Sequence, residues 1–414
     1  GAGLVPRAAA DPPAAGAGGE GEGASQGLGT VAVTINVVKA IMGAGCFALP
    51  WAFAQGGVAL VAGCMVGAAA LCLYTLSAML RAKYAVLEGG EAREEDVTTY
   101  TGIAKAALGP FGGTAAEAMI CVTCFGICSA YLVFMATTLF TVFGSAGSSV
   151  ALTQNQLVAV LTPAMVLLSW MRDLSGISFT SLLGNVSVAL GMGFVGFVAL
   201  SQPVLHSVPV AVPANFTSFF GSVAFLFFIH FSLPEIESGM ADKSKFIQAT
   251  LLAFLVCMAA GTAFGLAGAV GFGPGVSSVV VTMLQGGIAA TAVKLLLCIN
   301  LMFTFPVVVR AAFLVLEGFM PKASPATFRL MRTAFVLAAA YCGVAIPSFG
   351  KLLGLVGGVC CTALTLFFPP LMLVQVSKRR VANGKPSLVG GLEALSLYGV
   401  ALVALGVMAM SVVF

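Results

Sequence analysis

The stretch "NVVKAIMGAGCFALPWAF", residues 36–53, is mostly apolar, yet it contains Lys39, glycines at 43 and 45, and Pro50. Glycine is a poor helix former, and proline removes a backbone hydrogen-bond donor. Backbone that unwinds within lipid leaves polar groups unpaired, which is costly unless those groups line a cavity or bind something. The stretch therefore predicts an interrupted membrane helix beside a cavity, with a glycine-rich packing face as the alternative.

The composition sets the class of protein. The chain has 414 residues, of which 59% are hydrophobic and 8% are charged, whereas about a quarter of the residues of soluble proteins are charged. We therefore expect an all-α integral membrane protein. Residues 1–29 are mainly Ala, Gly and Pro and predict a disordered cytosolic tail. Residues 30–414 are expected to form a single membrane domain.

Eleven segments are apolar and long enough to cross a bilayer, which needs about 20 residues. They are residues 28–54, 57–80, 114–141, 153–171, 178–201, 216–240, 245–271, 288–317, 327–346, 350–376 and 390–414. The sequence thus predicts eleven transmembrane helices, with a cytosolic loop at 81–112 that holds a short helical pattern near 98–108.

The loop charges predict the orientation. If the N-terminus is cytosolic, the loops on that side hold Arg81, Lys83, Arg93, Lys105, Arg172, Lys243, Lys245, Lys322, Lys378, Arg379, Arg380 and Lys385. The opposite loops hold only Lys351. This bias follows the positive-inside rule and places the C-terminus on the opposite side. The membrane is expected to be the plasma membrane or that of a vacuole or lysosome.

A second interrupted span lies five spans after the first. It reads "FLFFIHFSLPEIESGM", residues 225–240, and contains His230 and Pro234. Because five is odd, the second set of five spans enters the membrane inverted. Matching broken helices in two inverted halves indicate a transporter site at the bilayer midplane. We expect repeat one at 30–202, repeat two at 215–376 and an extra helix at 390–414.

Half-helix ends suit one kind of solute. Free N–H groups attract a carboxylate, and free C=O groups attract an ammonium. A free amino acid carries both groups on one carbon atom. The two breaks therefore predict a backbone cradle for a zwitterion.

These residues resemble the amino acid/auxin permease family, within the amino acid–polyamine–cation superfamily. The resemblance covers nearly all of residues 28–414. Besides the two broken stretches, it rests on "INLMFTFPVVVRAAFLVLE" (299–317) and "AIPSFGKLLGLVGG" (345–358).

The resemblance implies a five-plus-five inverted-repeat fold with an eleventh helix and a substrate amino acid held at the breaks of spans one and six. The implied substrate-binding positions are Met42, Gly43, Ala44, Gly45, Cys46, Phe227, Phe228, His230 and Phe231. Many relatives have Gly just before the histidine, whereas this chain has Ile229, which predicts a bulkier pocket wall.

Four residues are candidates for ion coupling. Sodium-coupled relatives carry Asn at the position of Lys39 and a Thr that matches Thr304. An ammonium at Lys39 would repel sodium, so we favour proton-linked transport. Glu235 is expected to approach Lys39 in one conformational state. His230 is a candidate proton carrier or, alternatively, a hydrogen-bonded residue that fixes the pocket.

The expected function is secondary active transport of small neutral amino acids. A sodium-coupled or facilitative carrier, or an amino-acid sensor on the same fold, remains the alternative. A membrane enzyme would need a catalytic cluster at the membrane surface, and the sequence has no such cluster. We expect no catalytic residues, metal site, cofactor or nucleic-acid partner. The expected partners are the amino acid, a proton and the lipid bilayer.

Overall fold

The computed structural model describes residues 27–145, 152–171 and 178–413. The expected tail at 1–29 lies outside the described residues except for its last three. Of these, Leu28 pairs with the chain near Met240: its N–H donates to Gly239 O at 2.9 Å, and its carbonyl accepts from Ala241 N at 3.1 Å. The start of span one is therefore joined to the end of span six.

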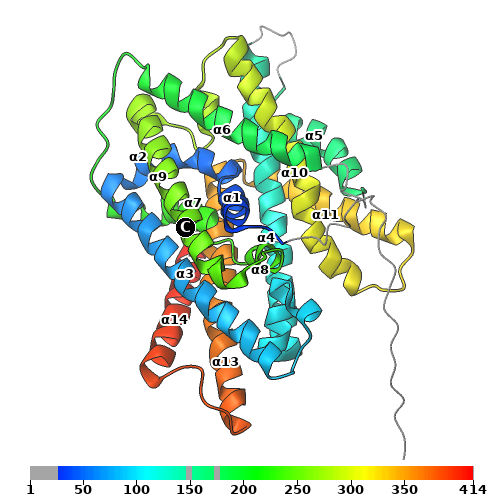
Figure 1. Cartoon of the computed structure of the whole chain (residues 1–414). Helices are drawn as coiled ribbons and strands as arrows, with labels where there is room; N and C mark the ends of the chain where they lie inside the picture. Colours follow the sequence, from blue (N-terminus) through cyan, green and yellow to red (C-terminus); the bar gives the residue numbers. More distant parts are fainter. Residues whose placement is uncertain (1–26, 146–151, 172–177, 414) are drawn as a thin grey trace, which may run out of the picture.

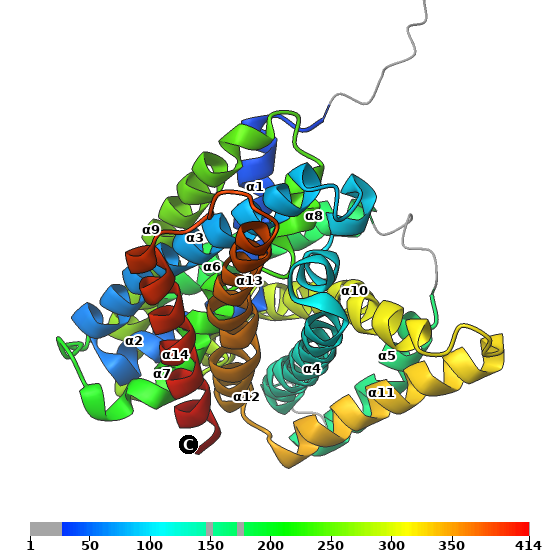
Figure 2. The ribbon, with the colours of Figure 1, turned by 90° about the horizontal axis from the view of Figure 1, so that it is seen from below.

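The described residues form helices and no named strands, which confirms the all-α class. The long helices are α3 (Val58–Glu88), α4 (Tyr100–Ser145), α9 (Phe246–Phe272), α10 (Ile288–Gly318), α11 (Pro325–Ala345) and α14 (Gly391–Val413). Two further helices are α5 (Gln154–Ser169) and α6 (Ser178–Leu200). Helices α5 and α11 lie side by side at one edge of the bundle, and α14 packs beside α13 (Phe368–Ala382) (Figures 1 and 2).

Span one is interrupted where the sequence predicts it. Helix α1 (Thr30–Ile41) ends before Gly43, a 3₁₀ turn follows at Ala44–Ala48, and α2 (Leu49–Gly56) continues the span. The two halves are bent by 49°. Met42 has φ −82° and ψ 68°, outside the helical range. Pro50 lies in the first turn of α2, where backbone N–H groups have no partner within the helix, so the missing N–H of proline costs no hydrogen bond.

Span six is interrupted in the same way. Helix α7 (Phe216–Phe227) stops at Phe228, whose φ of −87° and ψ of 74° resemble those of Met42. Residues 228–232 are not helical, and α8 (Leu233–Ser238) then starts with Pro234 in its first turn. Both broken helices that the sequence predicts are therefore present.

The structure supports the number of spans only in part. Among the described residues, seven helices are long and apolar enough to cross a membrane, or eight when α1 and α2 count as one span. Helix α5 and the described part of α6 are shorter apolar helices, and α7 and α8 have 12 and 6 residues. The count of eleven stays a prediction.

Span ten is continuous but irregular. It runs from α12 (Phe349–Leu355) through two π-helical stretches, Val356–Cys361 and Ala363–Phe367, into α13. A Cβ atom at Gly357 would lie 1.9 Å from Gly221 O of α7. Glycine is thus required here because two backbones meet without room for a side chain.

The predicted loop 81–112 is shorter than expected. Helix α3 continues to Glu88, so Arg81 and Lys83 lie on a helix, and Lys83 is buried rather than in a loop. The helical pattern expected near 98–108 is the start of α4. This helix is interrupted at Gly109, which has a φ of 80° and precedes Pro110.

Candidate functional site

The two breaks lie side by side. Helix α1 packs against α8, whereas the 3₁₀ turn and α2 pack against α7. A Cβ atom at Gly45 would lie 2.7 Å from the ring of Phe225 in α7. We call residues 42–46 and 227–231 the cradle.

The cradle contains backbone groups without partners. Within the described residues, the N–H group of His230 donates to no acceptor, and the carbonyl of Met42 accepts no hydrogen bond; both residues lie outside the helices. His230 is buried, and Met42 is half-buried. Because buried backbone groups are nearly always paired, free ones are expected to meet a ligand or water.

The side chains of the cradle are apolar, apart from His230. Cys46, Phe227 and Phe228 are buried, whereas Met42 and Phe231 are half-buried. A Cβ atom at Gly43 would meet no atom within 4 Å, so free space adjoins the break at this residue. Ile229, the residue expected to thicken the wall, is 5% exposed.

His230 is held by α3. Its side chain is fully buried, and its Nε2 lies 3.0 Å from Thr75 Oγ1. Its Nδ1 has no partner among the described residues. One turn earlier on α3, the Cys72 thiol donates to Phe227 O at 3.3 Å. Helix α3 thus contacts the break of span six at two points, and one ring nitrogen stays free for a solute or water.

Phenylalanine rings cover the cradle beside α2. Phe47, next to the cradle, contacts Phe134 of α4 and Phe264 of α9 edge to face, with ring centroids 6.1 and 5.9 Å apart. Phe134 in turn contacts Phe349 of α12 at 5.2 Å. All four rings are buried. On this side, the cradle is therefore closed by packed rings from the 3₁₀ turn and from α4, α9 and α12.

The side of α1 and α8 is more open. Lys39 and Glu235 are exposed, and neither takes part in an ion pair with another described residue. The expected approach of these two residues is therefore not made in this conformation. Helix α1 packs mainly on α9 and α8.

Thr304 lies in α10 and bonds within its own helix. Its hydroxyl donates to Asn300 O at 2.8 Å and lies 3.3 Å from Asn300 Oδ1. The structure brings neither Lys39 nor His230 into hydrogen-bond contact with Thr304.

One charged cluster was not predicted from the sequence. Lys83 Nζ lies 2.5 Å from Glu237 Oε2, and Tyr84 OH donates to Glu237 Oε1. The Lys83 and Glu237 side chains are 1% and 0% exposed. Opposite charges near the same end of spans two and six were the available signal, but Lys83 was assigned to a loop.

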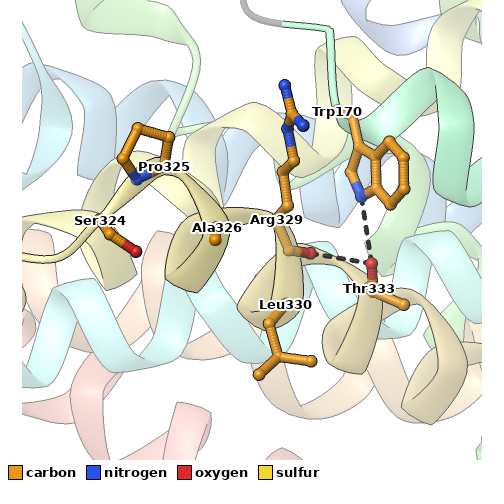
Figure 3. Close-up of a pocket in the computed structure, with 7 residues that line it drawn as sticks. All are labelled: Trp170, Ser324, Pro325, Ala326, Arg329, Leu330 and Thr333. Carbon is orange, nitrogen blue, oxygen red and sulfur yellow. Dashed lines mark hydrogen bonds between the residues drawn. The ribbon is translucent and has the colours of Figure 1, made fainter.

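Two cavities lie away from the cradle. A groove of about 610 Å³ between α5 and α11 is lined by Trp170, Arg329 and Thr333, among others (Figure 3). In it, Trp170 Nε1 donates to Thr333 Oγ1 at 3.0 Å. A second cavity of about 300 Å³ adjoins the Glu317–Arg332 ion pair. Neither includes a cradle residue.

Two solved structures have a similar fold. The chain aligns with the inward-facing conformation of Mhp1 with a TM-score of 0.54 and 14% identity, over 94% of this chain and 91% of that one. It also aligns with the manganese transporter of Eremococcus coleocola, with a TM-score of 0.53 and 13% identity, over 93% and 85%. Because the sequence identity is this low, the similarity shows a shared fold and no more.

Sequence relatives are amino acid transporters of Arabidopsis thaliana. The chain is 27% identical to amino acid transporter AVT3C over 84% of this chain and 83% of the relative. It is 26% identical to amino acid transporter ANT1 over 86% of each chain. These relatives are carriers rather than enzymes, in agreement with the expectation from the sequence.

The family model described as "Transmembrane amino acid transporter protein" matches residues 26–412, which is nearly the whole chain. This family agrees with the resemblance drawn from the motifs of spans one, six, eight and ten, and with a fold whose two broken helices lie together. The chain belongs to the transmembrane amino acid transporter family.

Proposed function

We propose that this protein is a secondary active transporter of small neutral amino acids that works by alternating access. The observation that carries the proposal is the pair of adjacent breaks, with a buried N–H group at His230 and a carbonyl at Met42 that have no partner within the described residues. The free N–H group matches a substrate carboxylate, and the free carbonyl of Met42 matches its ammonium.

The choice of neutral amino acids rests on the surroundings of the breaks. The cradle side chains Met42, Cys46, Phe227, Phe228 and Phe231 carry no charge. A charged substrate side chain would lose its hydration there without gaining an ion pair. Small size is favoured because Ile229 and the neighbouring rings are packed and buried.

The proposed architecture is eleven spans arranged as two inverted repeats and an extra helix. It is supported by breaks in the first and sixth spans, which share the same non-helical geometry at Met42 and Phe228. We propose a cytosolic N-terminus and a C-terminus on the opposite side, from the distribution of loop cations. The membrane is the plasma membrane or that of a vacuole or lysosome.

Alternating access is supported by the asymmetry around the cradle. Packed phenylalanine rings close the side of α2, α7 and α12, whereas Lys39 and Glu235 are exposed on the side of α1 and α8. With the proposed orientation, this conformation is closed to the outside and more open to the cytosol. The opposite conformation would separate the rings and bring α1 toward α10.

We propose that the coupled ion is H⁺. A lysine ammonium at residue 39 disfavours a sodium ion at the same place, and Thr304 is engaged by Asn300 of its own helix. In the proposed cycle Lys39 and Glu235 approach each other in the conformation that is closed to the cytosol, and His230 lies between the substrate and α3.

Uptake into proteoliposomes tests the function. We expect the purified chain to accumulate a radiolabelled neutral amino acid when an inward H⁺ gradient is imposed, with no requirement for Na⁺. Vesicles without protein are the control. Na⁺-dependent or gradient-independent uptake would instead favour the sodium-coupled or facilitative carrier. Binding without uptake would favour a sensor, and neither binding nor uptake across a panel of amino acids would refute the proposal.

A further inference from the structure

A buried ion pair joins α3 to α8 next to the cradle. Lys83 Nζ and Glu237 Oε2 are 2.5 Å apart, and Tyr84 OH donates to the other carboxylate oxygen. Neither charged side chain is more than 1% exposed. Charges inside a membrane protein are expensive and are retained mainly where they are paired and functional. Here both oxygens of Glu237 are satisfied by two consecutive residues of one helix.

Helix α8 needs such an anchor. It has six residues, Leu233–Ser238, whereas isolated helices shorter than about 12 residues are marginal. The non-helical residues 228–232 separate it from α7, so α7 cannot fix its rotation. Its orientation therefore depends on contacts with its neighbours. The bonds of Leu28 fix its C-terminal end, and Glu237 fixes the face that meets α3.

One face of α3 follows the whole break of span six. Cys72, Thr75 and Lys83 lie on this face, because eleven residues make about three helical turns. They contact, in order, the carbonyl of Phe227, the ring of His230 and the carboxylate of Glu237. The unbroken helix thus holds α7, the break and α8 over a length of about 16 Å.

We propose that Lys83, Tyr84 and Glu237 are positioning residues for transport. They hold α8 on α3 in the rotation that presents His230 and the free backbone groups of the cradle to the substrate. None of the three contacts the cradle backbone through a hydrogen bond; they act through α8. This inference rests on the proposed amino-acid transport and adds residues outside the cradle on which substrate affinity depends.

A different result is expected if Lys83, Tyr84 and Glu237 only fill space between α3 and α8. A buried ion pair can often be replaced by uncharged residues of similar shape without loss of stability. If the cluster only fills space, the uncharged double variant Lys83→Met/Glu237→Gln will fold and bind substrate normally. If directional bonds set the rotation of α8, this variant will fold but bind substrate weakly.

The test is amino-acid exchange in proteoliposomes at equal ion concentrations on both sides, which needs no driving gradient. We expect Lys83→Met/Glu237→Gln to keep a melting temperature close to that of the wild type while KM rises about tenfold and the maximal rate changes less. The reversed pair Lys83→Glu/Glu237→Lys restores an ion pair, so its KM is expected to lie between those of the uncharged double variant and the wild type. The matched control is Glu95→Gln, which removes one partner of an exposed ion pair with Arg93 and should leave KM unchanged.

Tyr84→Phe provides a second, milder test, because it removes one hydrogen bond and keeps the ion pair. It is expected to raise KM about threefold or more. Wild-type KM in Tyr84→Phe and in a folded double variant would overturn the positioning role. If the double variant does not fold, Tyr84→Phe decides alone. Absence of exchange by the wild type in the same vesicles would instead refute the proposed function, and this inference with it.

Discussion

Thr75 of the unbroken helix α3 and His230 in the break of span six share a buried hydrogen bond of 3.0 Å. The Thr75 hydroxyl is also bonded to Leu71 O at 2.9 Å within its own helix, so its orientation is fixed. The other ring nitrogen of His230 has no partner within the described residues. The bond therefore fixes the ring and leaves its Nδ1 as the nitrogen that can bind a solute.

Thr75→Val should weaken substrate binding without unfolding the protein. Valine keeps the shape of threonine but removes the hydroxyl, so a buried ring nitrogen loses its partner at a cost of about 1–3 kcal/mol. We expect KM for uptake to rise about tenfold. Thr75→Ser keeps the hydroxyl and should behave like the wild type. Equal KM values for the valine and serine variants would show that the bond does not position His230.

The two cradle glycines should respond differently to valine. At Gly43 an added Cβ meets no atom within 4 Å, whereas at Gly45 it would lie 2.7 Å from the ring of Phe225. Gly43→Val is therefore expected to fold with a normal melting temperature but lose substrate binding, because its side chain fills the free space at the break.

Gly45→Val is expected to lower the melting temperature or reduce the yield of folded protein, because overpacking typically costs about 1–3 kcal/mol. Thermal unfolding in detergent, followed by uptake, measures both effects. Normal uptake by a folded Gly43→Val protein would contradict a backbone cradle at this residue.

Lys39→Ala tests the coupling hypothesis. Lys39 is exposed in this conformation and pairs with no described acid, so its removal should not disturb folding. We expect uptake driven by an H⁺ gradient to fall at least about tenfold, while exchange at equal pH on both sides is largely kept. Lys39→Arg keeps the charge and is the matched control. Wild-type dependence on the H⁺ gradient in Lys39→Ala would assign coupling to another group.

The breaks of spans one and six could be predicted from the sequence because their causes are local. Gly43 and Gly45 lie just after the end of α1, and Pro50 and Pro234 lie in the first turns of α2 and α8, where the two spans become helical again. Local signals of this kind depend on the backbone of the residue itself. The placement of Phe227 to Phe231 in the second break came instead from the family resemblance.

The ion pair of Lys83 and Glu237 could not be predicted in this way. These residues are 154 positions apart in the sequence. A lysine shortly after an apolar segment is usually assigned to a loop. The prediction failed because α3 continues past residue 80 to Glu88 and carries Lys83 into the protein. The role of Thr75 was missed for a related reason, since a threonine within an apolar span has no distinctive pattern. Both contacts depend on which helices become neighbours.

The pH profile of uptake should not depend on the ion pair between Glu94 and Lys243. Lys243 Nζ lies 2.5 Å from Glu94 Oε1, and this hydrogen bond lowers the pKa of the Glu94 carboxyl. A carboxyl whose pKa is lowered on folding stabilises the protein above its unfolded pKa, about 4.3, and this contribution is lost as the pH falls through the folded pKa. The charge of Glu94 and its contribution to stability are thus constant between about pH 5 and 8. Glu94→Gln should therefore have a pH profile of uptake that superimposes on that of the wild type. A shifted profile would mean that this surface pair takes part in proton coupling, and would direct attention away from Lys39 and His230.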